Sequence, residues 1–342
     1  MLSRRSALKS AIAAPALIAA GCLSPASAAV TLKISHQFPG GTMEEGDFRD
    51  RLCRRFAAEL EKRTNGAITG QVYPNSSLMK TVAQFSALRK GALDVSLYPI
   101  SYAGGEFSEL NIGLMPGLVS SYAQGAAWKT SPVGEKFNKF VLDKGVVILS
   151  WIWQAGGVAS RSAPIVTPDD AKGLKIRGGS REMDMMLQAA GATTLNTPSN
   201  EIYAAMQTGA CDAAITSSTS LISFRLEEVA KSLTTGRGKS YWVMLEPLVM
   251  SKQVFDGLAK DQQAVIMALG AELEQFGSKE AMADDQKVAD VYAKKGAKVA
   301  DLDEATVDKW RAIARETAWK DYAAKSELAA ELIKLAEQVR VS

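Results

Sequence analysis

The first half of the chain alternates short strands with helices. Residues 32–36 alternate apolar and polar side chains, which predicts a half-buried strand. A helix is predicted after this strand, because Phe48, Leu52, Phe56 and Leu60 recur every four residues and so share one apolar face. Residues 67–73 and 93–98 read as two more strands, with a helix over 78–90 between them. The order β-α-β-α-β predicts an α/β domain with parallel strands.

A second run of the same kind begins near residue 163. It contains a predicted strand over 174–177, a helix over 181–190 and a strand over 211–215. Ser199 or Asn200 is expected to cap a further helix that ends near residue 206. The apolar segment 146–153 lies between the two runs and reads as one buried strand that leads into a crossover. The pattern therefore predicts two α/β domains.

Two later segments are expected to link these domains. Residues 241–250 form a long predicted strand with one proline, which could return the chain to the first domain. No proline occurs over 261–295, and one face of this segment stays apolar. An unbroken helix of this length would span about 50 Å and could brace two domains. The alternative is two helices broken near Gly277.

Composition fits a globular protein of about two domains. The chain has 342 residues, of which 47% are apolar and 23% charged, so intrinsic disorder is excluded. Residues 1–28 hold three of the 40 basic residues and no acid, which leaves 37 basic against 37 acidic residues in the remainder. Because the net charge of this remainder is zero, the composition gives no indication of binding to nucleic acid or to an anionic membrane.

The N-terminus has the features of an export signal. Arg4, Arg5 and Lys9 precede a short apolar segment, and a small-residue site ends at Ala28. We therefore expect residues 1–28 to be a signal peptide that is cleaved after Ala28, so that the mature protein is exported. The paired arginines resemble a twin-arginine signal, although the general secretory route stays open. No later segment reaches the ~18 consecutive apolar residues of a membrane helix, so a soluble mature protein is expected.

Templates for catalysis and metal binding fail on this sequence. His36 is the only histidine, which argues against a metal site or a mechanism that needs two. No phosphate-binding loop or dinucleotide fingerprint is present. Cys53 and Cys211 are expected to be separate buried thiols. We therefore predict no enzyme activity, no cofactor and no metal.

Several residues are suited to holding a small anion. Arg161 and Arg177 both stand at a strand end or turn, and a guanidinium matches a carboxylate with two parallel hydrogen bonds. Taken alone, either arginine is more typical of a surface ion-pair partner. Five consecutive hydroxyl residues, 216–220, follow a predicted strand and can donate to ligand oxygens. The alternative for this run is a capped loop. Aromatic residues at strand ends, such as Tyr102 and Trp242, are candidates either for packing or for lining a pocket.

A set of motifs resembles one family. The segments 64–66, 72–78 and 91–94 are similar to the N-terminal domain of the solute-binding subunits of TRAP transporters, the DctP family. Residues 173–177, Gly-Leu-Lys-Ile-Arg, resemble the arginine strand of that family, and residues 202–213 resemble its helix-strand signature. The similarity covers almost the whole mature chain, in the same order.

The resemblance implies a two-lobed periplasmic binding protein (a Venus-flytrap fold) with a long helix bracing both lobes. We expect lobe I to comprise 29–157 plus 246–285, and lobe II to comprise 158–245 plus 286–342. The implied partners are a small organic anion and the small and large membrane subunits of a TRAP transporter. The binding protein itself is expected to be a monomer.

By motif match, Arg177 corresponds to the family arginine that pairs with the ligand carboxylate, and Arg161 to a second arginine. The full set of predicted ligand-binding residues is Arg177, Arg161, Gln37, His36, Tyr98, Trp153, Ser199, Thr216, Ser217 and Tyr241. Residues 115–118 and 213–216 depart from the family pattern, so the resemblance does not identify the carboxylate. Alternatives are a binding protein that feeds a sensor and, less well supported, an exported enzyme that carries a cofactor.

Overall fold

The computed structural model describes residues 29–341 and contains two large sheets. The predicted signal peptide and its cleavage site lie outside these residues. The five-stranded sheet has the order β2-β1-β3-β12-β4. Its strands are β1 (Val30–Ser35), β2 (Ile68–Tyr73), β3 (Val95–Leu97), β4 (Val146–Ser150) and β12 (Leu248–Ser251). We call this sheet and the helices that cover it lobe I.

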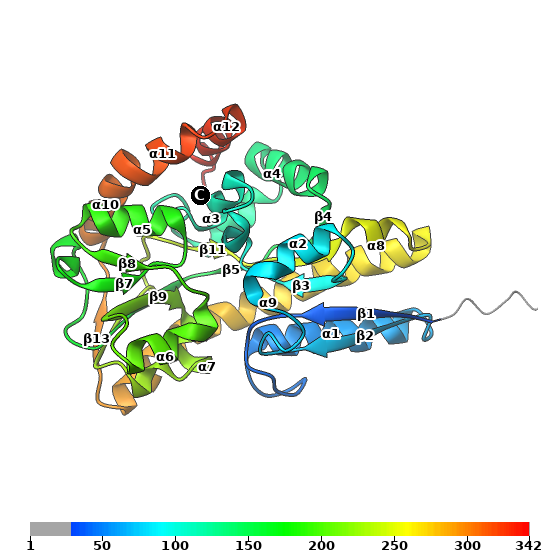
Figure 1. Ribbon diagram of the computed structural model, residues 1–342, viewed down its shortest axis with the longest axis horizontal. Helices are drawn as coiled ribbons and strands as arrows, with labels where there is room; N and C mark the ends of the chain where they lie inside the picture. Colours follow the sequence, from blue (N-terminus) through cyan, green and yellow to red (C-terminus); the bar gives the residue numbers. More distant parts are fainter. Residues whose placement is uncertain (1–28, 342) are drawn as a thin grey trace, which may run out of the picture.

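The six-stranded sheet has the order β13-β10-β6-β9-β7-β8 and forms the centre of lobe II. Its strands are β6 (Gly156–Ser160), β7 (Lys175–Arg177), β8 (Thr193–Leu195), β9 (Ala213–Ser217), β10 (Ser232–Thr235) and β13 (Lys298–Asp301). The two lobes lie side by side, joined by the pair β5 (Trp153–Gln154) and β11 (Met244–Leu245) (Figure 1).

Helices surround both sheets. They are α1 (Phe48–Arg63), α2 (Gln84–Arg89), α3 (Tyr122–Trp128), α4 (Pro132–Asp143), α5 (Arg181–Ala189), α6 (Ile202–Gln207), α7 (Ser218–Ser223), α8 (Lys252–Asp256), α9 (Lys260–Lys294), α10 (Glu304–Ala314), α11 (Lys320–Ala323) and α12 (Glu327–Ala336). The short helical turns that matter below are η2 (Ile100–Ala103), η3 (Ser108–Leu114) and η5 (Ser199–Glu201). Among the described residues, no helix combines the length and the apolar character that a membrane crossing requires.

The sheets are mixed, whereas the repeated β-α-β pattern predicts parallel strands. In lobe I, β12 runs antiparallel to both β3 and β4. In lobe II, β6 runs antiparallel to β9 and β10. Both exceptions are strands through which the chain passes from one lobe to the other. Because they enter their sheet from the hinge side, they run against the strands that are formed within the lobe.

Two predicted strands are each divided at the hinge. The segment 146–153 forms β4 in lobe I and then β5 between the lobes, and 241–250 contains β11 and β12. Pro247 separates β11 from β12 and has no N–H to donate to a ladder. Its carbonyl instead accepts a hydrogen bond from the Tyr98 N–H at 3.1 Å. The return of the chain to lobe I through β12 agrees with the prediction.

Helix α9 is one continuous helix, the first of the two alternatives from the sequence. It packs against α1 and β4 of lobe I and against α7, β10 and β13 of lobe II (Figure 1). A Cβ at Gly270 would lie 2.4 Å from the Leu149 carbonyl oxygen, and a Cβ at Gly277 would lie 3.2 Å from Ile152. Glycine at 277 therefore brings the helix close to the hinge without breaking it.

The C-terminal helices contact both lobes. Helix α10 packs against α5 of lobe II, but α12 packs against α4 and η3 of lobe I (Figure 1). The Trp319 indole donates to the Pro116 carbonyl at 2.7 Å, and the Tyr322 hydroxyl donates to the Glu109 carbonyl at 2.8 Å. The assignment of residues 286–342 to lobe II stays a prediction, and within this segment α12, Trp319 and Tyr322 contact lobe I. Cys53 and Cys211 are both buried and unbonded, as expected.

Candidate functional site

Arg177 ends β7 and is held between the lobes with only 3% of its surface exposed. Its Nε donates to the Thr197 carbonyl at 2.9 Å, and Nη1 donates to the Ile215 carbonyl at 2.8 Å. Nη2 donates to the Tyr102 hydroxyl oxygen at 2.8 Å. These bonds use three of the five N–H groups of a guanidinium and fix its plane. One N–H on each terminal nitrogen remains for the two oxygens of a carboxylate.

The two glycines after Arg177 leave room for charged side chains. A Cβ at Gly179, which has φ of +96°, would lie 2.8 Å from Nη1 of Arg177. A Cβ at Gly178 would lie 2.3 Å from Oδ1 of Asp184. Any larger residue at either position would displace one of these groups, so the glycines keep the guanidinium accessible.

The cavity beside Arg177 is narrow and has walls from both lobes. Its volume is about 10 Å³ in this closed arrangement, close to the space that one water molecule needs. Its lining residues are Pro99, Tyr102, Leu114, Arg177, Gly178, Gly179, Ser199, Ile215, Thr216, Trp242 and Met244. The Tyr102 hydroxyl of lobe I also accepts from the Ser199 N–H of lobe II at 3.0 Å. Any ligand larger than water must therefore enter when the lobes are further apart.

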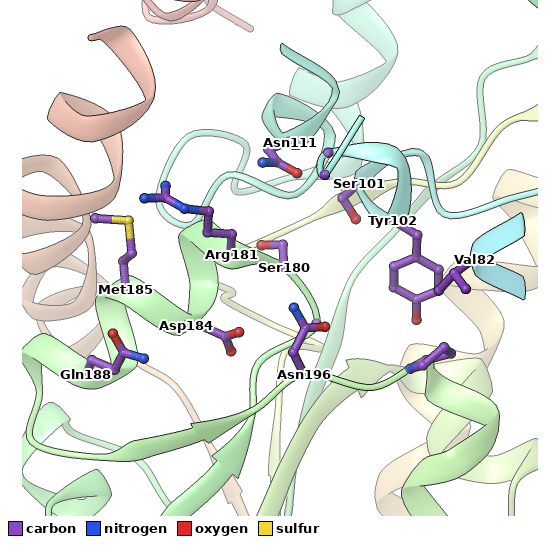
Figure 2. A pocket seen from close by; sticks show the side chains of 14 residues that line it. Val82, Ser101, Tyr102, Asn111, Ser180, Arg181, Asp184, Met185, Gln188 and Asn196 are labelled. Atoms are coloured by element: carbon purple, nitrogen blue, oxygen red, sulfur yellow. The ribbon is translucent and has the colours of Figure 1, made fainter. Parts of the chain in front are cut away.

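A larger cavity of about 560 Å³ adjoins this one and shares Tyr102 and Gly179 with it (Figure 2). Figure 2 shows Asn111 and Ser101 from lobe I opposite Asp184 and Asn196 from lobe II. Arg181 also lines this space, but it forms an ion pair with Asp321. We identify the Arg177 cavity as the candidate anion site, because there a buried guanidinium has N–H groups to spare.

Two buried carboxyl groups follow Arg177 on α5. Burial raises the pKa of Asp184 to about 7, although the nearby charge of Arg177 opposes the shift. Burial also raises the pKa of Glu182 to about 7, although Glu182 accepts a hydrogen bond from Asn111 across the lobes at 2.9 Å. A carboxyl group that is uncharged up to about pH 7 repels an anion beside it less than a carboxylate does.

The raised pKa of Asp184 predicts how stability changes with pH. The unfolded chain releases this proton near pH 3.8, whereas the folded protein keeps it until about pH 7. The folded state therefore binds more protons between these values, and this group lowers the free energy of unfolding as the pH rises from about 4 to 7. At pH 8, Asp184→Asn is expected to be more stable than the wild type by about 2–4 kcal/mol, at about 1.4 kcal/mol per pKa unit.

Urea unfolding of the ligand-free protein at pH 4 and pH 8 measures this effect. The exposed carboxylate Asp169 serves as a control, because Asp169→Asn removes a charge that is not buried. Equal stabilities of wild type and Asp184→Asn at pH 8 would contradict the account of a buried, destabilised carboxylate.

Three of the ten predicted ligand-binding residues line the Arg177 cavity. They are Arg177 itself, Ser199 at the start of η5 and Thr216 near the end of β9. All three lie at or just beyond strand ends in lobe II. The family motifs and the hydroxyl residues 216–220 predicted ligand-binding residues at these positions. Their contact with a ligand stays a prediction.

Arg161 and Arg177 line different cavities in the structure, and a ligand contact of Arg161 stays a prediction. Arg161 is exposed and lines a surface cavity with Tyr203 and Glu228. It follows β6, which runs antiparallel to β9, so its backbone N–H bonds to Asp212 just before β9 begins. Thr216 lies toward the opposite end of β9. The direction of β6 therefore places Arg161 and Thr216 at opposite ends of the β6–β9 pair.

Three predicted residues of lobe I do not line the Arg177 cavity and have other contacts. The Nε2 of His36 and a carboxylate oxygen of Asp50 are 3.1 Å apart, and Nδ1 of His36 accepts from the Phe38 N–H at 3.2 Å. Gln37 is buried and accepts from the Thr81 hydroxyl at 3.4 Å. Tyr98 is buried and packs edge-on against Tyr102, with ring centres 6.1 Å apart.

The remaining three predicted residues also have other contacts. Trp153 is buried in β5 and packs edge-on against Trp128 at 5.2 Å, and Tyr241 stacks on Trp310 at 5.1 Å. The Ser217 hydroxyl accepts from the Ser220 N–H at 3.2 Å and so caps α7. None of these three side chains lines the cavity beside Arg177.

The residues that hold Arg177 in place could not be identified from the sequence. Tyr102 was only one member of a group of aromatic residues at strand ends, as was Trp242, which lines the cavity. Thr197 and Ile215 contribute carbonyl oxygens, which any residue type possesses. The remaining signal was the family match at Arg177, which does not identify its partners.

The bacterial extracellular solute-binding protein family 7 model, DctP, matches residues 42–326. A solute-binding protein of Albidiferax ferrireducens is 66% identical over 90% of this chain and 91% of its own length. The C4-dicarboxylate-binding periplasmic protein DctP of Rhodobacter capsulatus is 25% identical, with 90% of each chain covered.

A crystal structure of a TRAP periplasmic solute-binding protein from Rhodoferax ferrireducens, with bound malonate, has the same fold. Its TM-score is 0.89 at 66% identity, and the match covers 90% of this chain and 98% of that one. The two-lobed fold that the sequence predicted is thereby confirmed. The chain belongs to the DctP family, the bacterial extracellular solute-binding proteins of family 7, and is a solute-binding protein of TRAP transport rather than an enzyme.

Proposed function

We propose that this protein captures a short dicarboxylate, of the size of malonate, in the cavity beside Arg177. The observation that carries the proposal is the Arg177 guanidinium, which is buried between the lobes and oriented by three hydrogen bonds. A buried cation is destabilised unless a counter-charge compensates it, so an anionic ligand is favoured there. The bound malonate of the Rhodoferax ferrireducens relative, which is 66% identical, supports the same ligand class.

The size of the cavity supports a small ligand. Tyr102 of lobe I and Ser199 of lobe II meet across it through one hydrogen bond. A ligand that parts these groups only slightly can still contact both lobes, and it binds the closed form better than the open one. Such a ligand shifts the population toward closure. Thr216 also lines the cavity, where its hydroxyl can donate to a second carboxylate.

We further infer that the protein works in the periplasm after removal of residues 1–28. The Arg4-Arg5 region and the small-residue site before Ala29 support export and cleavage there. The closed form would then dock on the small and large membrane subunits of a TRAP transporter, which take up the ligand with an ion gradient. Family membership supports this partner class. Mass spectrometry of the protein isolated from the periplasm tests the cleavage site, because the mass identifies the first residue of the mature chain.

Binding of malonate is tested by thermal unfolding of the purified protein. A ligand at 100 times its dissociation constant stabilises the native state by about 2.7 kcal/mol. Malonamide is the matched control, because it has nearly the same shape but no charge, and we expect it to produce no shift. Succinate and malate report how much longer or more hydroxylated a ligand can be. Equal shifts with malonate and malonamide, or no shift with any carboxylate, would contradict the proposal.

A further inference from the structure

A second buried arginine, Arg49, connects both lobes without lining the Arg177 cavity. It lies at the start of α1 in lobe I and has no exposed surface. Its Nε and Nη2 donate to the two carboxylate oxygens of Asp47 at 2.9 and 2.7 Å. Nη1 donates to Glu246, in the connection between β11 and β12, at 3.2 Å. The guanidinium carbon lies 3.6 Å from the centre of the Phe38 ring.

The two remaining N–H groups of Arg49 cross to lobe II. Nη1 donates to the Ser217 hydroxyl at 3.3 Å, and Nη2 donates to the Ser220 hydroxyl at 3.1 Å. All five donors of the guanidinium are therefore used. Ser217 ends β9 directly after Thr216, which lines the Arg177 cavity, and Ser220 lies in the first turn of α7.

The acceptors of Arg49 divide into two groups. Asp47 and Glu246 neutralise its charge and belong to lobe I and the hinge, so these ion pairs do not depend on how lobe II is placed. The two serine hydroxyls are neutral and belong to lobe II, so they accept from Arg49 only when the lobes have this orientation. Hydrogen bonds to a charged group are about twice as strong as those between neutral groups.

We propose that Arg49 is a positioning residue for ligand binding, which stabilises the closed form through Ser217 and Ser220 and holds Thr216 against the cavity. This inference rests on the proposed binding function of the Arg177 cavity. When the lobes separate, Arg49 keeps its carboxylates but loses both hydroxyls. A weaker contact to lobe II lowers the closed fraction of the free protein, and the apparent affinity falls in proportion.

The substitution Ser220→Ala tests this contact most cleanly. It removes one acceptor of Arg49 in lobe II, which is also the acceptor of the Ser217 hydroxyl, but leaves both ion pairs of Arg49 and the Ser217 cap of α7 in place. Ser223→Ala is the matched control on the same helix, because the Ser223 hydroxyl has no hydrogen-bond partner among the described residues. Arg49→Lys is the second variant: it keeps the charge but loses the fork that reaches both serines.

Spin labels at Lys90→Cys in lobe I and Lys172→Cys in lobe II report the distance between the lobes. Both positions are exposed, whereas Cys53 and Cys211 are buried, so labelling is selective. In the ligand-free protein we expect Ser220→Ala and Arg49→Lys to move the distance distribution toward the open form. We expect the dissociation constant for malonate to rise about tenfold, because a hydrogen bond to a charged group is lost. Ser223→Ala is expected to behave as the wild type.

The two proposals can fail separately. If Ser220→Ala and Arg49→Lys change only the unfolding temperature, while lobe distances and malonate affinity stay at wild-type values, Arg49 has a merely structural role and the inference is wrong. If wild-type protein binds neither malonate nor another carboxylate, the proposed function fails. The lobe distances of the ligand-free variants still test the role of Arg49 in that case.

Discussion

Arg177→Lys is expected to raise the dissociation constant for malonate by about 30-fold or more, while the protein still folds. Lysine keeps the positive charge but lacks the planar fork that binds two carboxylate oxygens. It also cannot reach Thr197, Ile215 and Tyr102 together, so the charge would no longer be held against the cavity. Truncating one partner of a desolvated charge pair costs about 2–5 kcal/mol of binding free energy.

Calorimetric titration with malonate measures this effect, with circular dichroism to verify folding. Arg161→Lys is the matched control, because Arg161 is exposed and does not line the Arg177 cavity, so its replacement is expected to leave affinity unchanged. An Arg177→Lys variant that binds within about twofold of the wild type would remove Arg177 as the carboxylate ligand.

Arg49→Met is expected to lower the free energy of unfolding by about 3–5 kcal/mol, because it leaves buried carboxylates without their cation. Asp47 and Glu246 lose their ion pairs with Arg49, and both are at least 95% buried. The pKa of Glu246 is already raised by burial, and Arg49 is the charge that opposes this shift.

Urea unfolding at pH 7 measures the loss, with Arg63→Met as a control on the same helix. Arg63 pairs with Glu272 on the surface, where an ion pair contributes about 0–1 kcal/mol. A loss for Arg49→Met no larger than the loss for Arg63→Met would show that the buried cluster does not depend on its arginine.

The periodic patterns predicted most of the elements, because each reflects local burial. The apolar stripe of α1, the strands β1 and β2 and the uninterrupted helix α9 all follow from spacing within one segment. The divided strands at the hinge do not, because every residue of 146–153 except Ser150 is apolar, and these apolar residues serve both β4 and the packing around β5. A continuous apolar run does not record where a chain leaves one sheet for another.

Residues of the site could be predicted only where they belong to a motif that is local in the sequence. Arg177, Ser199 and Thr216 each follow a local signature, and all three line the cavity. The surroundings of Arg161 could not be predicted, because the direction of β6 depends on pairing with β9, more than 50 residues later in the chain.

The hydrogen-bond partners of Arg177 and Arg49 could not be predicted either, because they lie far from these arginines in the sequence. Tyr102 and Arg177 are separated by 75 residues, and Arg49 and Ser217 by 168. The buried role of Arg49 was likewise hidden, because an arginine at the start of an amphipathic helix reads as a solvated side chain.

A crystal structure of the mature protein grown with malonate tests the central claim most directly. We expect one malonate between the lobes, with a carboxylate accepting hydrogen bonds from both terminal nitrogens of Arg177 and with Thr216 within hydrogen-bond distance of the ligand. Malonate bound elsewhere on the protein, or bound between the lobes without contact to Arg177, would contradict it.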